Sequence, residues 1–441
     1  MKISVIGCGY LGAVHAAAMA TLGHEVVGLD VDAEKIASLA AGRAPFYEPG
    51  LPELLSEAGA SGNLRFTTDP ELLREARVHF LGVGTPQAAD GGAADLSYLH
   101  AALDTLLPRL SPGDLVVGKS TVPVGTAETL VARVRERGAE LAWNPEFLRE
   151  GFAVQDTLRP DRLVYGFAAE SLVREGESVS APGRELLDEV YADALAAGTP
   201  LVVTDFATAE LVKVAANAFL ATKISFINAM AEIADVTGGD VSDLATAIGY
   251  DNRIGSRFLR AGIGFGGGCL PKDIRAFSAR ANELGVGESL GFLAEVDAIN
   301  LRRRDHVVER AEAILGDLAG RRITVLGLAF KPDSDDVRDS PALDIATRLA
   351  ARGAVVTATD PQAVETARRH TPELNYVTST DAALRGAELV LVLTEWSEFR
   401  NLDPVAAAAL VEAPIVIDGR NCLDRAAWRG AGWAYHGLGR R

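Results

Sequence analysis

The sequence predicts an α/β protein in which two doubly wound parallel sheets are joined by a central helical domain. Strand-like apolar runs alternate with helical patterns near both ends of the chain, whereas the middle is helical. Such alternation is typical of a parallel sheet with helices on both faces. The 441 residues also exceed the ~250–300 residues at which a single core stops growing. We therefore expect more than one domain.

The first part of the chain supplies one sheet. Short apolar runs predict its strands, and apolar residues at helical spacing predict the helices between them. The predicted strands are Ile3–Ile6, Glu25–Leu29, His79–Val83 and Leu115–Val117, and the predicted helices are Leu11–Leu22, Leu99–Leu107 and Ala127–Arg137.

Helical patterns fill the middle of the chain, and strand patterns then return. Residues 207–247 and 289–315 have apolar residues at helical spacing, and the second stretch is long enough to join two domains or to pack a dimer. We predict an N-terminal domain over residues 1–200, a central helical domain over 201–316 and a C-terminal α/β domain over 317–441. The strands predicted in the last domain are Arg322–Leu326, Val355–Thr359, Leu389–Leu393 and Ile415–Ile417.

Composition excludes several classes of function. A net charge of −17 argues against nucleic acid as a partner, because phosphate backbones bind basic surfaces. Three cysteines (Cys8, Cys269 and Cys422) cannot all pair, which favours a reducing cytoplasm. The chain starts without a signal-peptide pattern, contains no uninterrupted apolar run of ~18 residues, and spaces its histidines unlike metal ligands. We expect neither a membrane span nor a metal site.

The first predicted strand is followed by Gly7-Cys8-Gly9-Tyr10-Leu11-Gly12, which fits the Gly-x-Gly-x-x-Gly pattern of a Rossmann-like dinucleotide turn. The glycines allow a tight turn, close approach of a pyrophosphate, and contact between helix and sheet. Asp30 ends the next strand, where a carboxylate accepts hydrogen bonds from a ribose diol and repels a 2′-phosphate. The sequence therefore predicts NAD, rather than NADP, as cofactor.

The two ends of the chain share this arrangement. Ile323–Gly327 repeats the pattern of Ile3–Gly7, and Asp360 ends its second strand as Asp30 does. The interval between Gly327 and Asp360 is longer and holds the charged segment 331–338. We infer two related Rossmann-like domains, of which the second has a charged loop in place of the dinucleotide turn.

A reactive thiol is predicted in residues 264–273, which read Gly-Phe-Gly-Gly-Gly-Cys-Leu-Pro-Lys-Asp. Three glycines before Cys269 would let a ligand approach the backbone closely. Lys272 and Asp273 would place a cation and a proton carrier near the thiol, as a nucleophilic cysteine needs. The alternative is a buried cysteine that packs as a small hydrophobic residue.

Two further pairs of side chains could support chemistry. Glu146 and Glu150 are four residues apart and would share one face if the segment were helical, so that they could divide acid and base work. Lys213 and Asn217 are also four apart, within a strongly apolar helix. The alternatives are a solvated acidic face and a lysine that extends its charged end to solvent.

These motifs, with others along the chain, resemble those of the nucleotide-sugar 6-dehydrogenase (UDP-glucose/GDP-mannose dehydrogenase) family. The matching motifs occur in family order along nearly the whole chain, and Tyr47–Gly50 is most similar to the UDP-glucose members. Position 268 is Gly where many members carry Ser. The motifs are Gly7–Gly12, Tyr47–Leu51, Lys119–Pro123, Asn144–Glu150, Lys213 with Asn217, Gly264–Asp273, Ala329–Lys331, Arg338–Ser340 and Asp418–Arg420.

The resemblance implies a four-electron oxidation of UDP-glucose to UDP-glucuronate by two NAD molecules, through a thiohemiacetal and a thioester on Cys269. It implies that Lys213 and Asn217 stabilise oxyanions, that Asp273, Glu150 and Thr121 handle protons and water, and that Glu146 orients the substrate or Lys213. It also implies a homodimer in the cytoplasm. The implied NAD contacts are Gly7, Gly9, Tyr10, Leu11, Gly12, Asp30, Lys35, Thr85, Ser120, Thr121, Glu150, Lys272 and Arg338. The implied substrate contacts are Glu146, Phe147, Leu148, Lys213, Asn217, Arg253, Phe258, Gly266, Cys269, Phe330, Lys331 and Arg420.

Three alternatives stay open at this point. GDP-mannose or UDP-N-acetylmannosamine could be the substrate. A two-electron β-hydroxyacid dehydrogenase also pairs a dinucleotide domain with a helix carrying Lys and Asn, but needs neither Cys269 nor a second α/β domain. A non-catalytic sensor of nucleotide sugars could keep the same fold.

Overall fold

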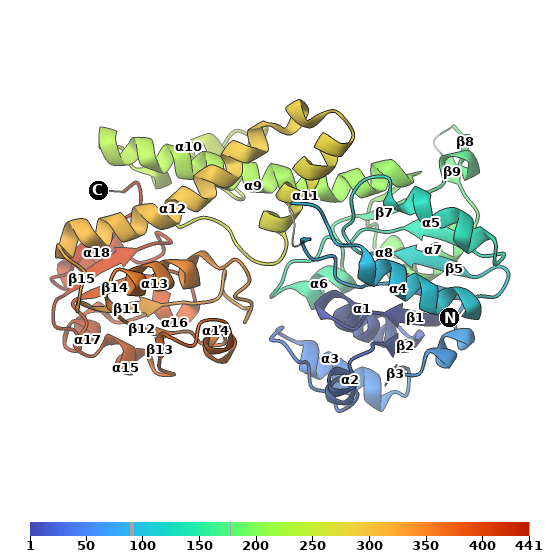
Figure 1. The fold of residues 1–441 in the computed structure, drawn as a ribbon, viewed down its shortest axis with the longest axis horizontal. Helices are drawn as coiled ribbons and strands as arrows, with labels where there is room; N and C mark the ends of the chain where they lie inside the picture. Colours follow the sequence, from blue (N-terminus) through green and yellow to red (C-terminus); the bar gives the residue numbers. More distant parts are fainter. Residues whose placement is uncertain (89–91, 177, 441) are drawn as a thin grey trace. The chain divides into compact units, whose positions relative to one another are not determined.

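The computed structural model describes residues 1–88, 92–176 and 178–440, which form two compact units (Figure 1). The N-terminal unit comprises Met1–Ala216 with Asn282–Leu284, and the C-terminal unit comprises Asn217–Ala281 with Gly285–Arg441. Helix α9 (Phe206–Thr237) runs in the chain from the first unit into the second.

The N-terminal unit is built on an eight-stranded sheet with strand order β10-β7-β6-β5-β4-β1-β2-β3. From β3 to β6 the strands are parallel and follow the order of a Rossmann fold, with the switch point between β1 and β4. The strands are β1 (Lys2–Ile6), β2 (Glu25–Leu29), β3 (Leu64–Thr67), β4 (Val78–Leu81), β5 (Leu115–Gly118), β6 (Glu140–Trp143), β7 (Leu163–Phe167) and β10 (Leu201–Asp205), with a separate hairpin of β8 (Val173–Glu175) and β9 (Ser178–Ser180).

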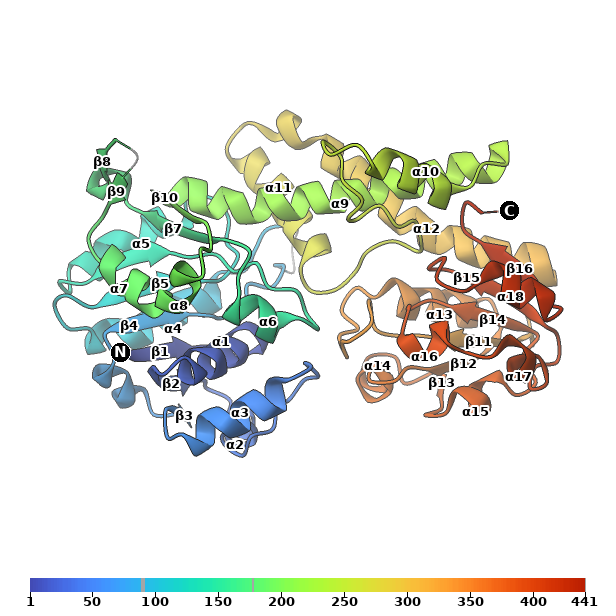
Figure 2. The ribbon, with the colours of Figure 1, turned by 180° about the vertical axis from the view of Figure 1, so that it is seen from behind.

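Helices cover both faces of this sheet (Figures 1 and 2). One face packs against α1 (Tyr10–Thr21), α2 (Ala33–Ala40), α3 (Leu51–Ala60), α6 (Ala153–Leu158), α7 (Arg184–Val190) and α8 (Ala192–Ala196). The other packs against α4 (Ser97–Leu106), α5 (Thr126–Arg135), the start of α9 and the short 3-10 helices η1 (Pro70–Glu75) and η2 (Leu107–Arg109). A third 3-10 helix, η3 (Ala169–Ser171), follows β7.

The C-terminal unit repeats this arrangement with a six-stranded parallel sheet in the order β13-β12-β11-β14-β15-β16. The spatial order of these strands is again that of a Rossmann fold, which confirms the predicted doubly wound α/β class. The strands are β11 (Arg322–Leu326), β12 (Val355–Thr359), β13 (Asn375–Tyr376), β14 (Leu389–Val392), β15 (Ile415–Asp418) and β16 (Ala434–Gly437). The covering helices are α13 (Pro341–Ala351) and α14 (Val364–His370) with the end of α12 (Phe292–Leu315) on one face, and α15 (Thr380–Leu384), α16 (Ser397–Arg400), α17 (Pro404–Ala408) and α18 (Arg425–Gly430) on the other.

A helical layer in the same unit is formed by the second half of α9, α10 (Val241–Gly249), α11 (Leu270–Glu283), η4 (Gly287–Leu290) and α12 (Phe292–Leu315). The helix predicted over 207–247 is interrupted at Gly238, which has a φ of +82°. Asp240 then caps α10 by accepting a hydrogen bond from the Ser242 N–H. Helix α9 is long and apolar enough to cross a membrane by length and composition, a test that core helices of soluble proteins also pass.

Two strands of the N-terminal sheet differ in direction from the prediction of a parallel sheet. Strand β7 pairs with β6 in antiparallel orientation, and β10 pairs with β7 in parallel orientation. The last two strands therefore extend the Rossmann order in the reverse direction. An apolar run does not encode its direction, because direction depends on the connection that precedes the strand.

Candidate active site

The positions of the dinucleotide turn are glycine for different physical reasons. A Cβ atom on Gly12 would lie 1.8 Å from the Gly7 carbonyl oxygen, and Gly7 itself has a φ of +90°. The protein's own packing therefore requires both. A Cβ on Gly9 would meet nothing within 4 Å, so this residue borders open space. The N-terminus of α1 starts at the same place, and its unpaired N–H groups fit a pyrophosphate.

Asp30, directly after β2, faces this turn. Its carboxylate accepts hydrogen bonds from the backbone N–H groups of Cys8 (2.8 Å) and Asp32 (3.0 Å), and it pairs with the ammonium of Lys35 at 3.0 Å. The residues present thus fit the nicotinamide dinucleotide that the sequence predicts, with an acid at the ribose position. The thiol of Cys8 is buried, and this burial raises its pKa.

Two loops follow β4 and β5 at the carboxyl edge of the sheet, where ligands bind in open α/β folds. The Thr85 hydroxyl donates to the Thr121 carbonyl oxygen at 2.7 Å, and the Ser120 hydroxyl donates to the Val83 carbonyl oxygen at 2.6 Å. Both hydroxyls therefore tie the loops together. Contacts of Thr85, Ser120 and Thr121 with a cofactor stay predictions.

Glu146 and Lys213 form a buried ion pair. Their carboxylate and ammonium are 2.7 Å apart, and the side chains are only 12% and 7% exposed. The second carboxylate oxygen of Glu146 accepts from the Leu148 N–H at 2.6 Å. The Phe147 ring lies 5.8 Å from the lysine nitrogen. The Lys213 ammonium is therefore buried and held in place by Glu146, and the interpretation as a lysine that extends to solvent is wrong.

The segment that carries Glu146 and Glu150 is a loop. The expectation that both acids share one helical face is therefore wrong. Helix α6 begins only at Ala153. Glu150 is half-buried and lies near enough to the Tyr10 hydroxyl to contribute to its raised pKa, which burial and Glu48 raise more strongly.

Lys119 is buried without having been predicted as a site residue. Its ammonium donates to the Asn144 side-chain oxygen at 3.0 Å and to the Tyr191 hydroxyl at 3.2 Å. It thereby joins the loop after β5 to the start of the loop that carries Glu146. Burial lowers the pKa of Lys119 to about 8; the Glu146 carboxylate opposes this shift and Lys213 adds to it.

This pKa predicts a pH-dependent contribution to stability. A lysine in the unfolded chain has a pKa of ~10.4, so between about pH 8 and ~10 the unfolded state binds more protons than the folded state, and stability rises with pH. We expect the free energy of unfolding of the wild type, measured relative to that of Lys119→Met, to rise by roughly 2 kcal/mol as the pH increases across this window. Urea denaturation at several pH values measures it. Lys2→Met, at an exposed lysine, should show no such trend; a flat or falling difference for Lys119→Met would contradict the prediction.

In the C-terminal unit, Cys269 lies at the N-terminus of α11, and its carbonyl oxygen accepts the Asp273 N–H at 2.9 Å. The side chain of Cys269 is exposed, so the packing interpretation is wrong. Asp273 is 2% exposed, and its carboxylate accepts from the Asn217 amide at 2.7 Å and from Lys272 at 2.6 Å. The positive end of the helix dipole favours negative charge where the thiol lies. This arrangement suits a nucleophilic thiolate with an acid–base group nearby.

The three glycines before Cys269 pack against the protein itself. A Cβ on Gly266 would lie 2.3 Å from the Asp339 carbonyl oxygen, and one on Gly267 would lie 2.8 Å from the Phe330 ring. One on Gly268 would meet the Arg338 guanidinium at 2.4 Å. The expectation that these glycines leave room for a ligand is therefore corrected: segment 330–339 fills that space. A serine at position 268 would require Arg338 to move.

Several predicted contacts already have protein partners. The Arg420 guanidinium donates to the carbonyl oxygens of Leu393, Gly264 and Phe330 at 2.8–3.0 Å, and it thus holds the Cys269 loop to the second sheet. Arg338 pairs with Asp336, and the Lys331 ammonium lies 5.3 Å from the Phe330 ring. Direct roles for these residues toward substrate or NAD stay predictions.

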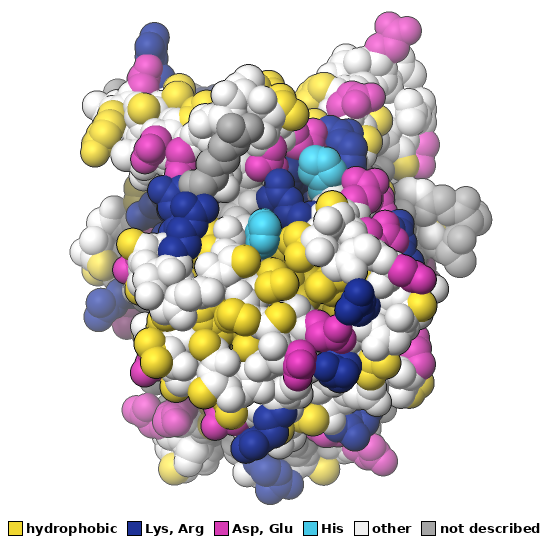
Figure 3. Space-filling view, turned by 90° about the vertical axis from the view of Figure 1, so that its left-hand side faces the viewer, with side chains coloured by type: hydrophobic (Ala, Val, Ile, Leu, Met, Phe, Trp, Pro, Cys, Tyr) yellow, Lys and Arg dark blue, Asp and Glu magenta, His cyan; other side chains and the backbone are white. Residues whose placement is uncertain are grey.

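Two predicted substrate contacts lie on the surface of the C-terminal unit. Arg253 pairs with Asp251, and its side chain is 89% exposed. Phe258 is exposed and has a φ of +64°, a conformation that non-glycine residues rarely adopt. On the face drawn in Figure 3, basic and acidic side chains are interspersed.

Among the described residues, His, Cys, Asp and Glu form no group that could hold a metal ion.

The chain is similar over its full length to curated and solved proteins. It is 40% identical to the UDP-glucose 6-dehydrogenase TuaD of Bacillus subtilis (strain 168), covering 100% of this chain and 93% of that protein. It is also 40% identical to the UDP-glucose 6-dehydrogenase of Rhizobium meliloti (strain 1021), covering 100% of both. The solved structure of a UDP-glucose dehydrogenase from the archaeon Pyrobaculum islandicum is 39% identical, with a TM-score of 0.89 and coverage of 100% and 98%.

Models of one family match three successive segments. Residues 1–193 match its NAD binding domain, residues 207–302 its central domain and residues 324–425 its UDP binding domain. The first segment contains the glycine turn and Asp30, the second contains Lys213, Asn217 and Cys269, and the third contains most of the second Rossmann-like sheet. With each part of the site falling in the corresponding domain, the chain is an NAD-dependent dehydrogenase and belongs to the UDP-glucose/GDP-mannose dehydrogenase family.

Proposed function

We propose that this chain oxidises UDP-glucose to UDP-glucuronate in two NAD-dependent steps, through a covalent intermediate on Cys269. The observation that carries the proposal is the exposed thiol of Cys269 at the N-terminus of α11, with the buried carboxylate of Asp273 one turn away. A two-electron β-hydroxyacid dehydrogenase would need no such thiol. The 40% identity to UDP-glucose 6-dehydrogenases along the whole chain supports UDP-glucose as substrate.

The chain's residues divide the chemistry between bond formation and charge stabilisation. The glycine turn and Asp30 would hold NAD, which would supply the hydride acceptor for each oxidation. The Cys269 thiolate adds to the carbonyl carbon of the intermediate aldehyde and forms a thiohemiacetal, whose loss of hydride leaves a thioester. Water attacks this thioester, the C–S bond breaks, and the carboxylate and the free thiol are released. Lys213 and Asn217 stabilise the oxyanions.

Proton transfers fall to the carboxylates. Asp273 and Glu150 accept protons from the alcohol and from water, Thr121 positions the water, and Glu146 fixes the Lys213 ammonium through the ion pair of 2.7 Å. For the nucleotide sugar we propose contacts with Phe147, Leu148, Arg253, Phe258, Gly266, Phe330, Lys331 and Arg420.

The stoichiometry of NADH tests this proposal. Purified protein with excess NAD should form two NADH per UDP-glucose consumed, with UDP-glucuronate as product. One NADH per substrate would favour the two-electron alternative, and binding without NADH formation would favour a sensor. The same assay with GDP-mannose and UDP-N-acetylmannosamine tests the sugar; a higher kcat/KM for either would overturn the choice of UDP-glucose.

Asp30→Ala should weaken the preference for NAD over NADP by about tenfold or more. The substitution removes the carboxylate that repels a 2′-phosphate and frees Lys35, whose ammonium lies 3.0 Å from it. The ratio of kcat/KM for the two cofactors measures this preference. Asp32→Asn is the matched control, since Asp32 lies in the same turn and caps α2. An unchanged ratio for Asp30→Ala, or an equal change for the control, would place specificity elsewhere.

We also propose a homodimer through α9. Phe219, Phe226 and Ile233 recur every seven residues along this helix and are 67%, 48% and 52% exposed. A stripe of this kind supports packing against a second helix; sedimentation at monomer mass would contradict it.

The three matched segments support domains at 1–200, 201–316 and 317–441, which limited proteolysis would test. Three free cysteines support a cytoplasmic location, testable by cell fractionation.

A further inference from the structure

Two buried glutamates in the N-terminal unit hold the starts of two helices in the same way. The Glu210 carboxylate accepts the backbone N–H groups of Gly125 at 2.6 Å and Ala127 at 2.7 Å. The Glu48 carboxylate accepts those of Gly151 at 2.6 Å and Ala153 at 2.7 Å. Both glutamates are 2% exposed. Each carboxylate thus bridges a glycine and the residue two positions later.

The local backbone explains why these contacts are strong. Gly125 and Gly151 have φ angles of +93° and +79°, and α5 and α6 begin one and two residues after them. The unpaired N–H groups at a helix start carry partial positive charge, which favours a carboxylate. Distances of 2.6–2.7 Å are typical of charge-assisted hydrogen bonds. Neither glutamine nor a neutral acid could accept both N–H groups equally well.

Both helices follow loops that carry predicted active-site residues. We name residues 119–125 the Thr121 loop, which contains Ser120 and Thr121 and ends where Glu210 binds. We name residues 144–151 the Glu146 loop, which contains Glu146 and Glu150 and ends where Glu48 binds. Each glutamate therefore fixes the far end of a loop whose near end is fixed by a strand of the sheet, β5 or β6.

The two loops are also joined to each other through α9. Glu210 lies one helical turn before Lys213, whose ammonium holds Glu146 at 2.7 Å. Lys119, in the Thr121 loop, donates to Asn144, in the Glu146 loop, at 3.0 Å. A displacement at either glutamate would therefore reach the Lys213–Glu146 pair.

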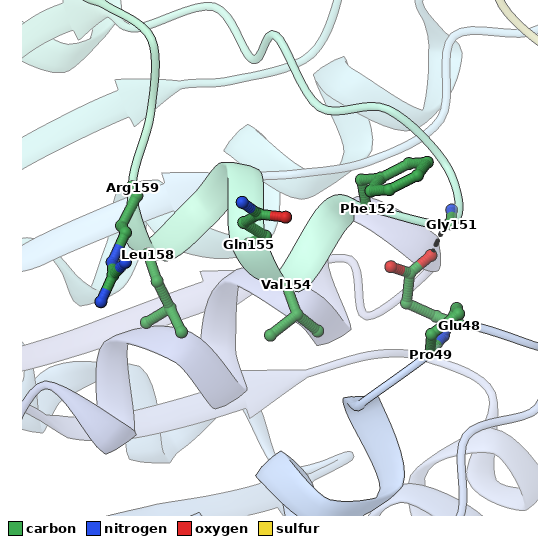
Figure 4. A pocket seen from close by; sticks show the side chains of 8 residues that line it. All are labelled: Glu48, Pro49, Gly151, Phe152, Val154, Gln155, Leu158 and Arg159. Carbon is green, nitrogen blue, oxygen red and sulfur yellow. Dashed lines mark hydrogen bonds between the residues drawn. The ribbon is translucent and has the colours of Figure 1, made fainter.

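Glu48 also connects the Glu146 loop to the cofactor turn. The Tyr10 hydroxyl, at the first position of α1, donates to the Glu48 carboxylate. A pocket of about 520 Å³ borders this joint and is lined by Glu48, Pro49, Gly151 and residues of α6 (Figure 4). The pocket adjoins one side of the start of α6, whereas Ala153 packs in the core on the other. Hydrogen bonds to Glu48 fix this end of the loop, together with those that Arg149 donates to Asp156 of α6.

We propose that Glu48 and Glu210 are positioning residues that set the geometry of the Glu146 loop and the Thr121 loop for proton transfer and water attack. This inference rests on the proposed function for its catalytic consequence. Neither glutamate contacts the reacting atoms; each acts through the loop that it holds. A displacement of ~1 Å at catalytic groups can cost about 10²-fold in rate.

The test compares Glu48→Gln and Glu210→Gln with wild type and with Asp424→Asn. Asp424 is the matched control, because its carboxylate accepts the Ala426 and Ala427 N–H groups at the start of α18, remote in sequence from the predicted site residues of the N-terminal unit. We expect each glutamine variant to lose about 10–100-fold in kcat per folded molecule, with KM for UDP-glucose changed less than ~3-fold. Circular dichroism reports the folded fraction, and Asp424→Asn should retain wild-type kcat.

Amide hydrogen exchange in the same samples tests positioning independently of activity. Glu48→Gln should accelerate exchange at residues 144–153, and Glu210→Gln at residues 119–127, each mainly in its own loop. Unchanged exchange in these peptides would overturn the inference whatever the substrate. Faster exchange with wild-type kcat would overturn the catalytic part. Absence of NADH formation by the wild type would instead refute the proposed function, while exchange would still decide the positioning.

Discussion

Cys269→Ser is expected to abolish formation of UDP-glucuronate from UDP-glucose, by at least ~10³-fold in kcat, leaving at most one NADH per UDP-glucose, while NAD binding is retained. A serine hydroxyl does not ionise near neutral pH, so neither thiohemiacetal nor thioester can form efficiently. The glycine turn that would hold NAD belongs to the other compact unit, and the substitution leaves its residues unchanged. NADH yield per UDP-glucose and the NAD dissociation constant measure the two effects.

Cys422→Ser is the matched control for this experiment. Cys422 belongs to the same unit, is partly buried, and burial raises its pKa, which makes it a poor nucleophile. We expect its variant to keep the stoichiometry of two NADH. Normal acid production by Cys269→Ser would remove Cys269 from the mechanism, and equal losses in both variants would indicate a general effect of losing a thiol.

Lys213→Met is expected to reduce both stability and activity, for separable reasons. Removal of the ammonium leaves the Glu146 carboxylate, which is 12% exposed, without its cation. Loss of one partner of a buried pair typically costs about 3–5 kcal/mol in the free energy of unfolding. Loss of an oxyanion-stabilising group typically costs about 10²–10³-fold in kcat. Urea denaturation and steady-state kinetics measure the two losses.

The double variant Lys213→Met/Glu146→Gln separates these effects. It removes both charges, so most of the lost stability should return, because no carboxylate is left unpaired. Activity should not return, because the cation at the oxyanion is still missing. Recovery of kcat together with stability would show that Lys213 acts only through the fold. A single Lys213→Met variant with kcat within tenfold of wild type would contradict the assigned role directly.

Local sequence patterns predicted the strands that build the centre of each sheet. Glu25–Leu29, Arg322–Leu326 and Val355–Thr359 coincide with β2, β11 and β12. After an exposed first residue these runs are mostly buried on both faces and therefore mostly apolar, a signal that needs no knowledge of distant residues. The two-residue strand β13 and the reversed pair β7 and β10 carry no comparable signal, since their existence and direction depend on neighbours far away in the chain.

The candidate site shows the same limit. The pattern Gly7–Gly12 with Asp30 predicted the cofactor turn, because turn geometry and helix start depend on adjacent residues. The four-residue spacing of Glu146 and Glu150 would place them on one face only if the segment were helical, and the segment is a loop. Glu210 resembles an ordinary helix-surface acid in sequence. Its carboxylate is held by the N–H groups of Gly125 and Ala127, which lie more than eighty residues earlier, so the local sequence does not show its role.

By itself, the sequence determined the α/β class, the two related sheets, the dinucleotide turn and the choice of Cys269 as candidate nucleophile. These features depend on hydrophobic periodicity and on residue types at fixed short spacing. Only the tertiary structure decided that Cys269 is exposed at a helix start, that Lys213 pairs with Glu146, and that Phe330, Arg338 and Asp339 occupy the space beside the three glycines. Burial, pairing and steric fit are set by contacts between distant segments, which no local pattern records.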